Sequence, residues 1–208
     1  PDALTSPFPN GYIPSVLESS FEDALAFEHA GEVIMLLQAD KKTGLTDKQK
    51  DKLLELFEFI DCRAGMSLPF NNLLEVKNYY YQAYSALKNG ILMKVDASLY
   101  NYDDYIVTEL LLNSANGKPA HIFFSSGLTA LVEYDRNSQV SYIDTLKIYL
   151  DNGMAVTKTA QALFIHRSTL LDRLAHINRY IGEELEDPEK RLAIRIAIGI
   201  QGLYSEFE

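Results

Sequence analysis

The chain has 208 residues and a net charge of −10, with 47% hydrophobic and 23% charged residues, which excludes a disordered polypeptide and allows one large or two small domains. Its apolar runs fall far short of the ~20 residues of a membrane-spanning helix, so we expect no membrane partner. The first residues lack a basic segment followed by an apolar run, which predicts that no signal peptide is present. The lone Cys62 excludes an intramolecular disulfide and fits a reducing compartment, so the expected location is cytoplasmic.

The first part of the chain predicts a small α/β arrangement. Residues 1–20 contain four prolines and read as a loop or terminus with a short helix near 15–20. Strands and helices are then expected in the order β-β-α-β-α-β, with the first two strands forming a hairpin and Thr46 capping the first of these helices. The expected ranges are residues 24–28, 32–38, 47–60, 63–68, 72–87 and 91–95.

The second part of the chain predicts helices alone. Residues 135–141 form a polar turn that is a plausible domain boundary. Thr157 and Ser168 are expected to cap two of the helices, and Gly182 to end the second of them. The alternating residues 194–200 could form a strand, but the start signal of Asp187 and Pro188 favours a helix. The expected helices cover residues 103–113, 127–134, 141–150, 158–163, 168–181 and from 188 onward.

Charge is distributed unevenly along the chain. The strongly acidic balance argues against a non-specific nucleic-acid binder, which would usually be basic. Residues 141–208, however, carry only eight Lys or Arg against ten Asp or Glu, and residues 154–182 carry four basic residues and one acidic residue. This local net of +3 fits either a DNA-binding surface or an exposed helix face, so the case for DNA depends on the local pattern.

Residues 157–181 have the layout of a helix-turn-helix: a short helix, a tight turn and a longer amphipathic helix. Ala160, Leu163, Ile165 and Leu170 supply the small and apolar side chains that brace the second helix against the first. Polar side chains near the start of the second helix would then reach base edges and phosphates of double-stranded DNA. The candidate DNA-binding residues are Thr157, Lys158, His166, Arg167, Ser168, Thr169, Asp172, Arg173 and His176.

Several of these residues have a second interpretation. His166 could contact a phosphate or equally hydrogen-bond the backbone within the turn. Arg173 could reach DNA or pair with an acidic residue inside the domain. Asp172 could accept from a cytosine amino group or remain a solvated surface acid, and His176 could serve as a plain surface residue.

The amino-acid sequence of this segment resembles that of a known family. The C-terminal helix-turn-helix of PucR/CdaR-type regulators, which control purine catabolism and sugar-diacid use in bacteria, has a similar run of residues. The resemblance covers about the last 68 residues and is carried by TKTAQALFIHRSTLLDRLAHI at 157–177, TLKIYLDNG at 145–153 and LEDPEKRLAI at 185–194. Leu171 and Asp172 depart from it, because the family often places a basic residue and Tyr on this helix. Fewer positive contacts imply weaker attraction to phosphates or a different preferred sequence.

The preceding part is similar to the degenerate GGDEF-like domain of the same family, through GMSLP at residues 65–69 and YYQAYSAL at 80–87. The resemblance implies a fold class of α+β: a partial cyclase-like palm with a mixed or antiparallel sheet, followed by an all-α helix-turn-helix domain. An opening strand and helix are missing before Pro1, so we expect a truncated chain. The expected domains are a terminal loop at 1–20, the GGDEF-like domain at 21–97, a helical linker at 98–140 and the DNA-binding domain at 141–208.

The hypothesis for function is a fragment of a DNA-binding transcriptional regulator that acts as a homodimer, with a small-molecule effector acting through the missing N-terminal region. The alternative is a protein-interaction or dimerisation module whose helical tail does not bind DNA. An enzyme has no support: HAGE at residues 29–32 lacks the paired acids that hold Mg²⁺ in a cyclase, and no other catalytic motif is present. We therefore expect no catalytic residue, no metal and no cofactor.

Overall fold

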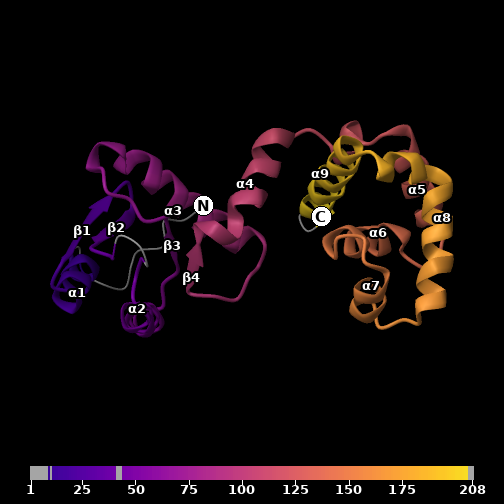
Figure 1. The fold of residues 1–208 in the computed structure, drawn as a ribbon. Coiled ribbons are helices and arrows are strands. Elements are labelled where there is room, and N and C mark those ends of the chain that lie inside the picture. Colours follow the sequence, from indigo (N-terminus) through magenta and orange to yellow (C-terminus); the bar gives the residue numbers. More distant parts are fainter. Residues whose placement is uncertain (1–8, 10, 41–43, 206–208) are drawn as a thin grey trace. The chain divides into compact units, whose positions relative to one another are not determined.

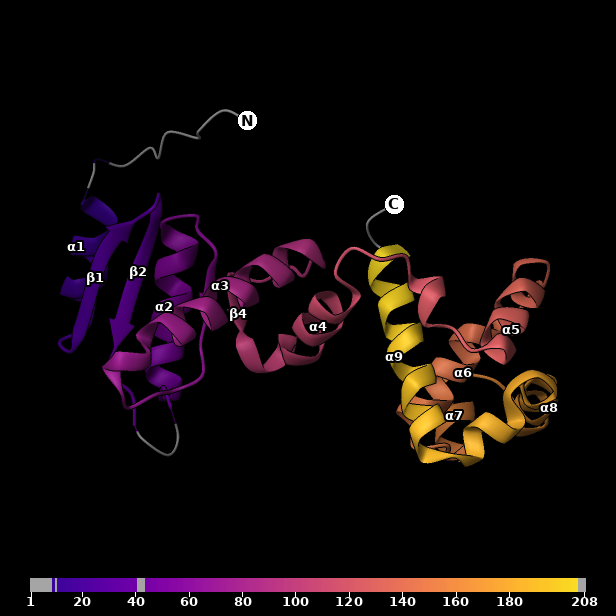
Figure 2. The same cartoon turned by 90° about the horizontal axis from the view of Figure 1, so that it is seen from above.

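The computed structural model describes residues 9, 11–40 and 44–205, so residues 1–8 and 10 of the expected N-terminal loop lie outside it. The chain divides into two compact units, the first comprising Pro1–Lys88 and Asp96–Asp103 and the second Asn89–Val95 and Asp104–Glu208 (Figures 1 and 2). The architecture is α+β, as the sequence predicts, because short strands occur in the first unit and the C-terminal part is entirely helical.

The first unit is built on an antiparallel hairpin of β1 (Ala24–His29) and β2 (Glu32–Leu37), whose register pairs His29 with Glu32 at the turn. Helices α1 (Tyr12–Ser20) and α2 (Asp47–Phe59) contribute Leu17, Leu53 and Phe57 to a buried cluster that also contains Ala26 of β1. Because side chains alternate along a strand, this core lies against one face of the hairpin. The predicted hairpin and the helix after it are confirmed.

Thr46 caps α2 as predicted. Its hydroxyl accepts from the N–H of Gln49 at 3.3 Å, while the Gln49 side-chain oxygen accepts from the N–H of Thr46 at 2.9 Å. This reciprocal pair is a capping box, which supplies partners for two backbone N–H groups that the helix itself cannot bond.

The strand expected at residues 91–95 is wrong. The 3₁₀ turn η1 (Leu73–Glu75) leads into α3 (Val76–Leu92), which continues through Asn89 and Gly90, where the sequence indicated an end. Asn89 is buried and its side-chain amide donates to Glu109 Oε2 at 2.8 Å, so this residue is held inside the helix by a partner twenty positions away.

The last strand of the first unit lies further along the chain. Here β4 (Leu99–Asn101) pairs in parallel with β3 (Ala64–Met66). Within the described residues the strands form two separate two-stranded sheets rather than the single mixed sheet that the sequence predicted.

The second unit is helical, and the part that follows residue 122 shares one core. It contains α4 (Tyr102–Ala115) except its first two residues, the 3₁₀ turn η2 (Ala120–Phe123), α5 (Ser126–Arg136), α6 (Tyr142–Asp151), α7 (Val156–Ala162), α8 (Arg167–Glu186) and α9 (Pro188–Ser205). The alternating residues 194–200 lie within α9, which confirms the prediction of a helix. Leu128 and Leu131 of α5 are fully buried in the same cluster as Leu146 and Leu170, so this core draws on residues before position 141.

Helix α8 is kinked where the sequence predicts its end. The helical geometry is interrupted at Ile181, whose φ is −131° and ψ 15°, directly before the Gly182 that was expected to end the helix, and a second helical stretch then runs to Glu186. The physical reason is that Ile181 and Leu185 are both buried in the core, so the chain gains apolar burial by continuing. At this point α5 approaches closely, since a Cβ on Gly127 would collide with the carbonyl oxygen of Tyr180.

Candidate nucleic-acid interface

Helices α7 and α8 form a braced pair joined by a short turn (Figure 1). Ala160 of α7 and Leu170 of α8 are buried, and Leu163 and Ile165 in the connection pack against the same core. Thr159 is buried as well, and its hydroxyl donates to the Ala155 carbonyl at 2.9 Å. The Thr159 bond lies within α7, whereas the packed apolar side chains hold α8 against α7, which is the function that the sequence assigns to the small and apolar residues of this segment.

The predicted helix caps at this pair are wrong. Helix α7 begins after Ala155, which offers no capping side chain, and Thr157 lies inside its first turn. At α8 the capping residue is His166 instead of Ser168: the His166 Nδ1 accepts from the Ser168 N–H at 3.3 Å and lies 2.7 Å from the Ser168 hydroxyl. Of the two interpretations of His166, the structure therefore shows the one within the turn.

Seven of the nine candidate residues are exposed on the surface of this pair. Lys158 is exposed on the first turn of α7, and Arg167 is exposed as the first residue of α8. The Ser168 N–H of this turn already donates to His166 Nδ1, so an anion placed there would meet the Arg167 guanidinium group and the remaining N–H donors of the first turn. The exposed set is Thr157, Lys158, His166, Arg167, Ser168, Thr169 and Asp172.

Arg173 and His176 turn into the helical unit. The Arg173 Nη1 donates to the Thr145 hydroxyl of α6 at 3.3 Å, a partner that the sequence did not indicate. The His176 ring stacks on Tyr134 of α5, with centroids 6.1 Å apart, and lies 5.6 Å from the ring of Tyr142. Both side chains thus tie α8 to neighbouring helices.

The aromatic cluster around His176 was missed by the sequence analysis. Tyr134 also lies 5.4 Å from Tyr142 and 5.7 Å from Tyr180, centroid to centroid. Burial and the neighbouring Tyr134 raise the pKa of Tyr142, against the opposing effect of the Arg173 guanidinium. The spacing of His176 and Tyr180, four residues apart and hence on one helix face, is the signal that could have indicated this cluster.

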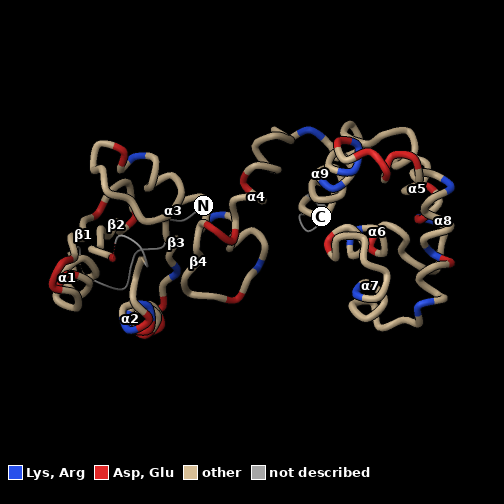
Figure 3. The backbone as a smooth tube through the Cα atoms, viewed as in Figure 1, with Lys and Arg blue, Asp and Glu red and all other residues tan. Residues whose placement is uncertain are grey.

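Charge favours the start of α8 over its end as a surface for an anion. The run of acids that begins at Glu183 lies sixteen residues beyond Arg167, or roughly 24 Å along the helix. Figure 3 shows the separation, with basic residues on α7 and at the start of α8 and acidic residues gathered near the end of α8. At a Debye length of ~8 Å, these acids are screened from the start of the helix.

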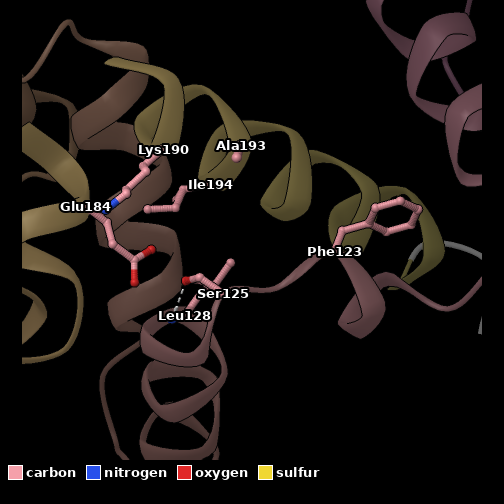
Figure 4. Close-up of a pocket in the computed structure, with 7 residues that line it drawn as sticks. All are labelled: Phe123, Ser125, Leu128, Glu184, Lys190, Ala193 and Ile194. Carbon is pink, nitrogen blue, oxygen red and sulfur yellow. Dashed lines mark hydrogen bonds between the residues drawn. The ribbon is translucent and has the colours of Figure 1, made fainter. Parts of the chain in front are cut away.

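A small hollow lies at the other end of the helical unit (Figure 4). Its volume is about 250 Å³, and its walls are mainly apolar side chains such as Leu128 and Ile194, with Glu184 and Lys190 beside them. The Ser125 hydroxyl there accepts from the Leu128 N–H at 3.1 Å, so it acts as the cap of α5. Ligand pockets usually enclose ~300–1,000 Å³, and this hollow does not change the assignment of the site.

Two further features bear on function. Within the described residues, no three His, Cys, Asp or Glu side chains come together in a group that could hold a metal ion. In the same part of the chain, none of the helices combines the length and the apolar character needed to cross a bilayer.

Comparison with known proteins places the helix-turn-helix pair in a family. Residues 142–200 match the PucR C-terminal helix-turn-helix domain. The purine catabolism regulatory protein of Bacillus subtilis (strain 168) is 31% identical over 141 residues, which is 68% of this chain and 26% of that protein. From the same strain, the DNA-binding transcriptional activator AdeR and the proline-responsive transcriptional activator PutR are each 24% identical, over 78% and 74% of this chain.

The chain spans between about a quarter and two fifths of the length of these three relatives. All three are named as regulators or activators, and the matched domain contains the whole of α6, α7 and α8. Residues 142–200 therefore form a helix-turn-helix domain of the PucR C-terminal type, and the chain is similar to PucR-type transcriptional regulators.

Proposed function

We propose that this chain binds double-stranded DNA as part of a transcriptional regulator, with α8 as the helix that enters the major groove. The observation that carries the proposal is the braced pair of α7 and α8, whose first turns expose Lys158, Arg167, Ser168 and Thr169. In helix-turn-helix readers the base contacts come from the start of the second helix, which is where these side chains are exposed.

The proposed contacts divide into two kinds. Lys158, Arg167 and the N–H groups at the start of α8 would hold phosphates and set the register of the protein on the duplex. Thr169 and Asp172 would face base edges, where Asp172 could accept from the amino group of cytosine. Arg173 and His176 are proposed to support this surface indirectly, because their observed partners are Thr145 and Tyr134.

The wider organisation is also a proposal. A single helix-turn-helix domain makes few contacts with DNA, so a homodimer that engages two half-sites would bind more tightly than one domain alone. A small-molecule effector would act through a region preceding this chain, and residues 21–97 would form the degenerate GGDEF-like domain. A regulator that binds chromosomal DNA would act in the cytoplasm without catalysing a reaction.

The competing candidate is a protein-interaction module without DNA binding. The observation in its favour is that Leu171 and Asp172 are both exposed on α8, so the surface offered to DNA includes an apolar and an acidic side chain. Such a module would self-associate or bind a protein partner while showing no preference for any duplex.

The test is selection of duplexes from a random library with the 208-residue chain, followed by affinity measurements over a salt series. We expect the selected duplex to bind about a hundredfold or more tightly than random DNA. Arg167→Gln should weaken binding and reduce the slope of log affinity against log salt by about 0.9, since one phosphate contact is lost.

Arg179→Gln is the matched control. Arg179 is exposed on the same helix but twelve residues, or roughly 18 Å, beyond Arg167, so its loss should leave the slope unchanged. If no duplex is selected and the chain instead self-associates, the interaction module is the better description.

A further inference from the structure

The turn between α7 and α8 has an unusual residue at its tightest point. Two nested backbone hydrogen bonds end helix α7: the Ile165 N–H donates to the Ala160 carbonyl and the Phe164 N–H to the Gln161 carbonyl, both at 3.1 Å. This is a Schellman motif, which requires the residue at the position of Phe164 to take the left-handed conformation. The φ of Phe164 is accordingly +54°.

The same motif ends α6 with the residue type that fits it. There the Gly153 N–H donates to the Leu150 carbonyl at 3.1 Å, the Met154 N–H donates to the Tyr149 carbonyl at 2.8 Å, and the φ of Gly153 is +62°. Glycine adopts this conformation without a steric cost, whereas a residue with a Cβ does not. The backbone of the α7–α8 turn is therefore better suited to glycine than to Phe164.

Burial does not compensate for this cost. Phe164 is 95% exposed, the highest exposed fraction among the large hydrophobic side chains in the described part of the chain. Its neighbours in the turn, Leu163 and Ile165, pack against the core, so the turn is anchored without it. Neither the backbone conformation nor the packing of the free protein accounts for an aromatic side chain at this position. A strained and exposed residue of this kind directs attention to a function outside the folded chain.

The surroundings indicate what Phe164 would meet. Its side chain leaves the turn three residues before Arg167, and Lys158 is exposed on the helix that the turn follows. These groups attract phosphates, and the atoms that lie beside phosphates in DNA include the apolar carbons of deoxyribose and the methyl group of thymine. An aromatic ring among phosphate-binding groups therefore has an apolar counterpart on the duplex.

We propose that Phe164 is a DNA-contacting residue whose ring packs against apolar atoms of the duplex, either a deoxyribose or a thymine methyl group. The inference rests on the proposed function of the α7–α8 pair. It adds to the polar contacts one that does not depend on counterion release, which gives it a distinct signature in a salt series.

The test compares Phe164→Gly and Phe164→Asn with the unchanged 208-residue chain on a duplex selected from a random library. Both replacements fit the left-handed position, so the thermal midpoint of the second unit should stay equal or rise. Affinity should fall about tenfold, and by the same factor at every salt concentration, because the free energy of burying part of a Phe ring corresponds to about a tenfold change in affinity. Arg167→Gln should instead change the slope of log affinity against log salt. Leu192 is an exposed apolar residue on α9, so Leu192→Ala should change neither the affinity nor this slope.

Replacing the thymines of the selected duplex by uracil separates the two apolar partners. Loss of the Phe164 effect on the uracil duplex identifies a thymine methyl group, and its persistence identifies the sugar. Unchanged affinity of Phe164→Gly, or a fall in its thermal midpoint, refutes this inference while leaving the proposed function intact. Failure of the unchanged chain to select any duplex refutes both.

Discussion

Adjacent leucines on α8 offer a direct measurement of how strongly this helix is held. Leu170 is completely buried in the core of the second unit, whereas Leu171, the next residue, is 46% exposed. Replacing a fully buried leucine by alanine removes its transfer free energy and leaves a cavity, with a typical cost of ~2–5 kcal/mol. For Leu170→Ala we expect a loss of about 3 kcal/mol.

The expected loss for Leu171→Ala is below about 1 kcal/mol. Roughly half of its side chain already contacts water, and alanine has a slightly better helix propensity than leucine. Urea unfolding followed by far-UV circular dichroism gives both free energies of unfolding, and hydrogen exchange of α7 and α8 localises the effect. If the two variants lose equal stability, the assignment of Leu170 to the contact between α7 and α8 is wrong.

Further changes probe individual features of the two units. His166→Ala should destabilise the second unit by about 1 kcal/mol in urea unfolding, and His166→Asn, which can also cap α8, should not. Burial and a neighbouring carboxylate raise the pKa of Cys62 to about 11. The rate of Cys62 alkylation should therefore increase with pH up to about 11, whereas an ordinary thiol levels off near 9. Because the unfolded chain loses this proton at lower pH than the folded one, the free energy of unfolding should fall as the pH rises from about 9 to about 11. Gly127→Ala should cost about 2 kcal/mol or more in thermal unfolding, because the new methyl group collides with the Tyr180 carbonyl. Gly182→Ala meets only ordinary contacts and should stabilise the second unit by ~0.5–1 kcal/mol, and a loss there would contradict a helical conformation of Gly182 after the kink.

The observed partners of Arg173 alter how a substitution there should be interpreted. Because its guanidinium donates to Thr145, removal of Arg173 disturbs the contact between α6 and α8 as well as the local charge. A loss of DNA binding in such a variant would therefore combine two effects, whereas Arg167 makes no such contact between helices in the described hydrogen bonds and tests the surface alone.

Local signals in the sequence determined most of the helices and the position of the helix-turn-helix pair. Thr46 with Gln49, and Asp187 with Pro188, mark helix starts through groups only a few residues apart, and the structure keeps both starts. The hairpin of β1 and β2 and the helical nature of residues 194–200 follow from the same kind of short-range pattern. Where the stabilising contact is local, the residue types alone are sufficient to predict it.

The tertiary structure decided the features whose partners lie far away in sequence. Helix α3 passes through Asn89 because Glu109 accepts from its buried amide, and a second helical stretch follows the kink of α8 because Ile181 and Leu185 gain burial. His176 faces Tyr134 rather than solvent for the same reason. Periodicity places a side chain on one face of a helix, but only the packing of other helices determines whether that face meets a protein neighbour or remains available to DNA.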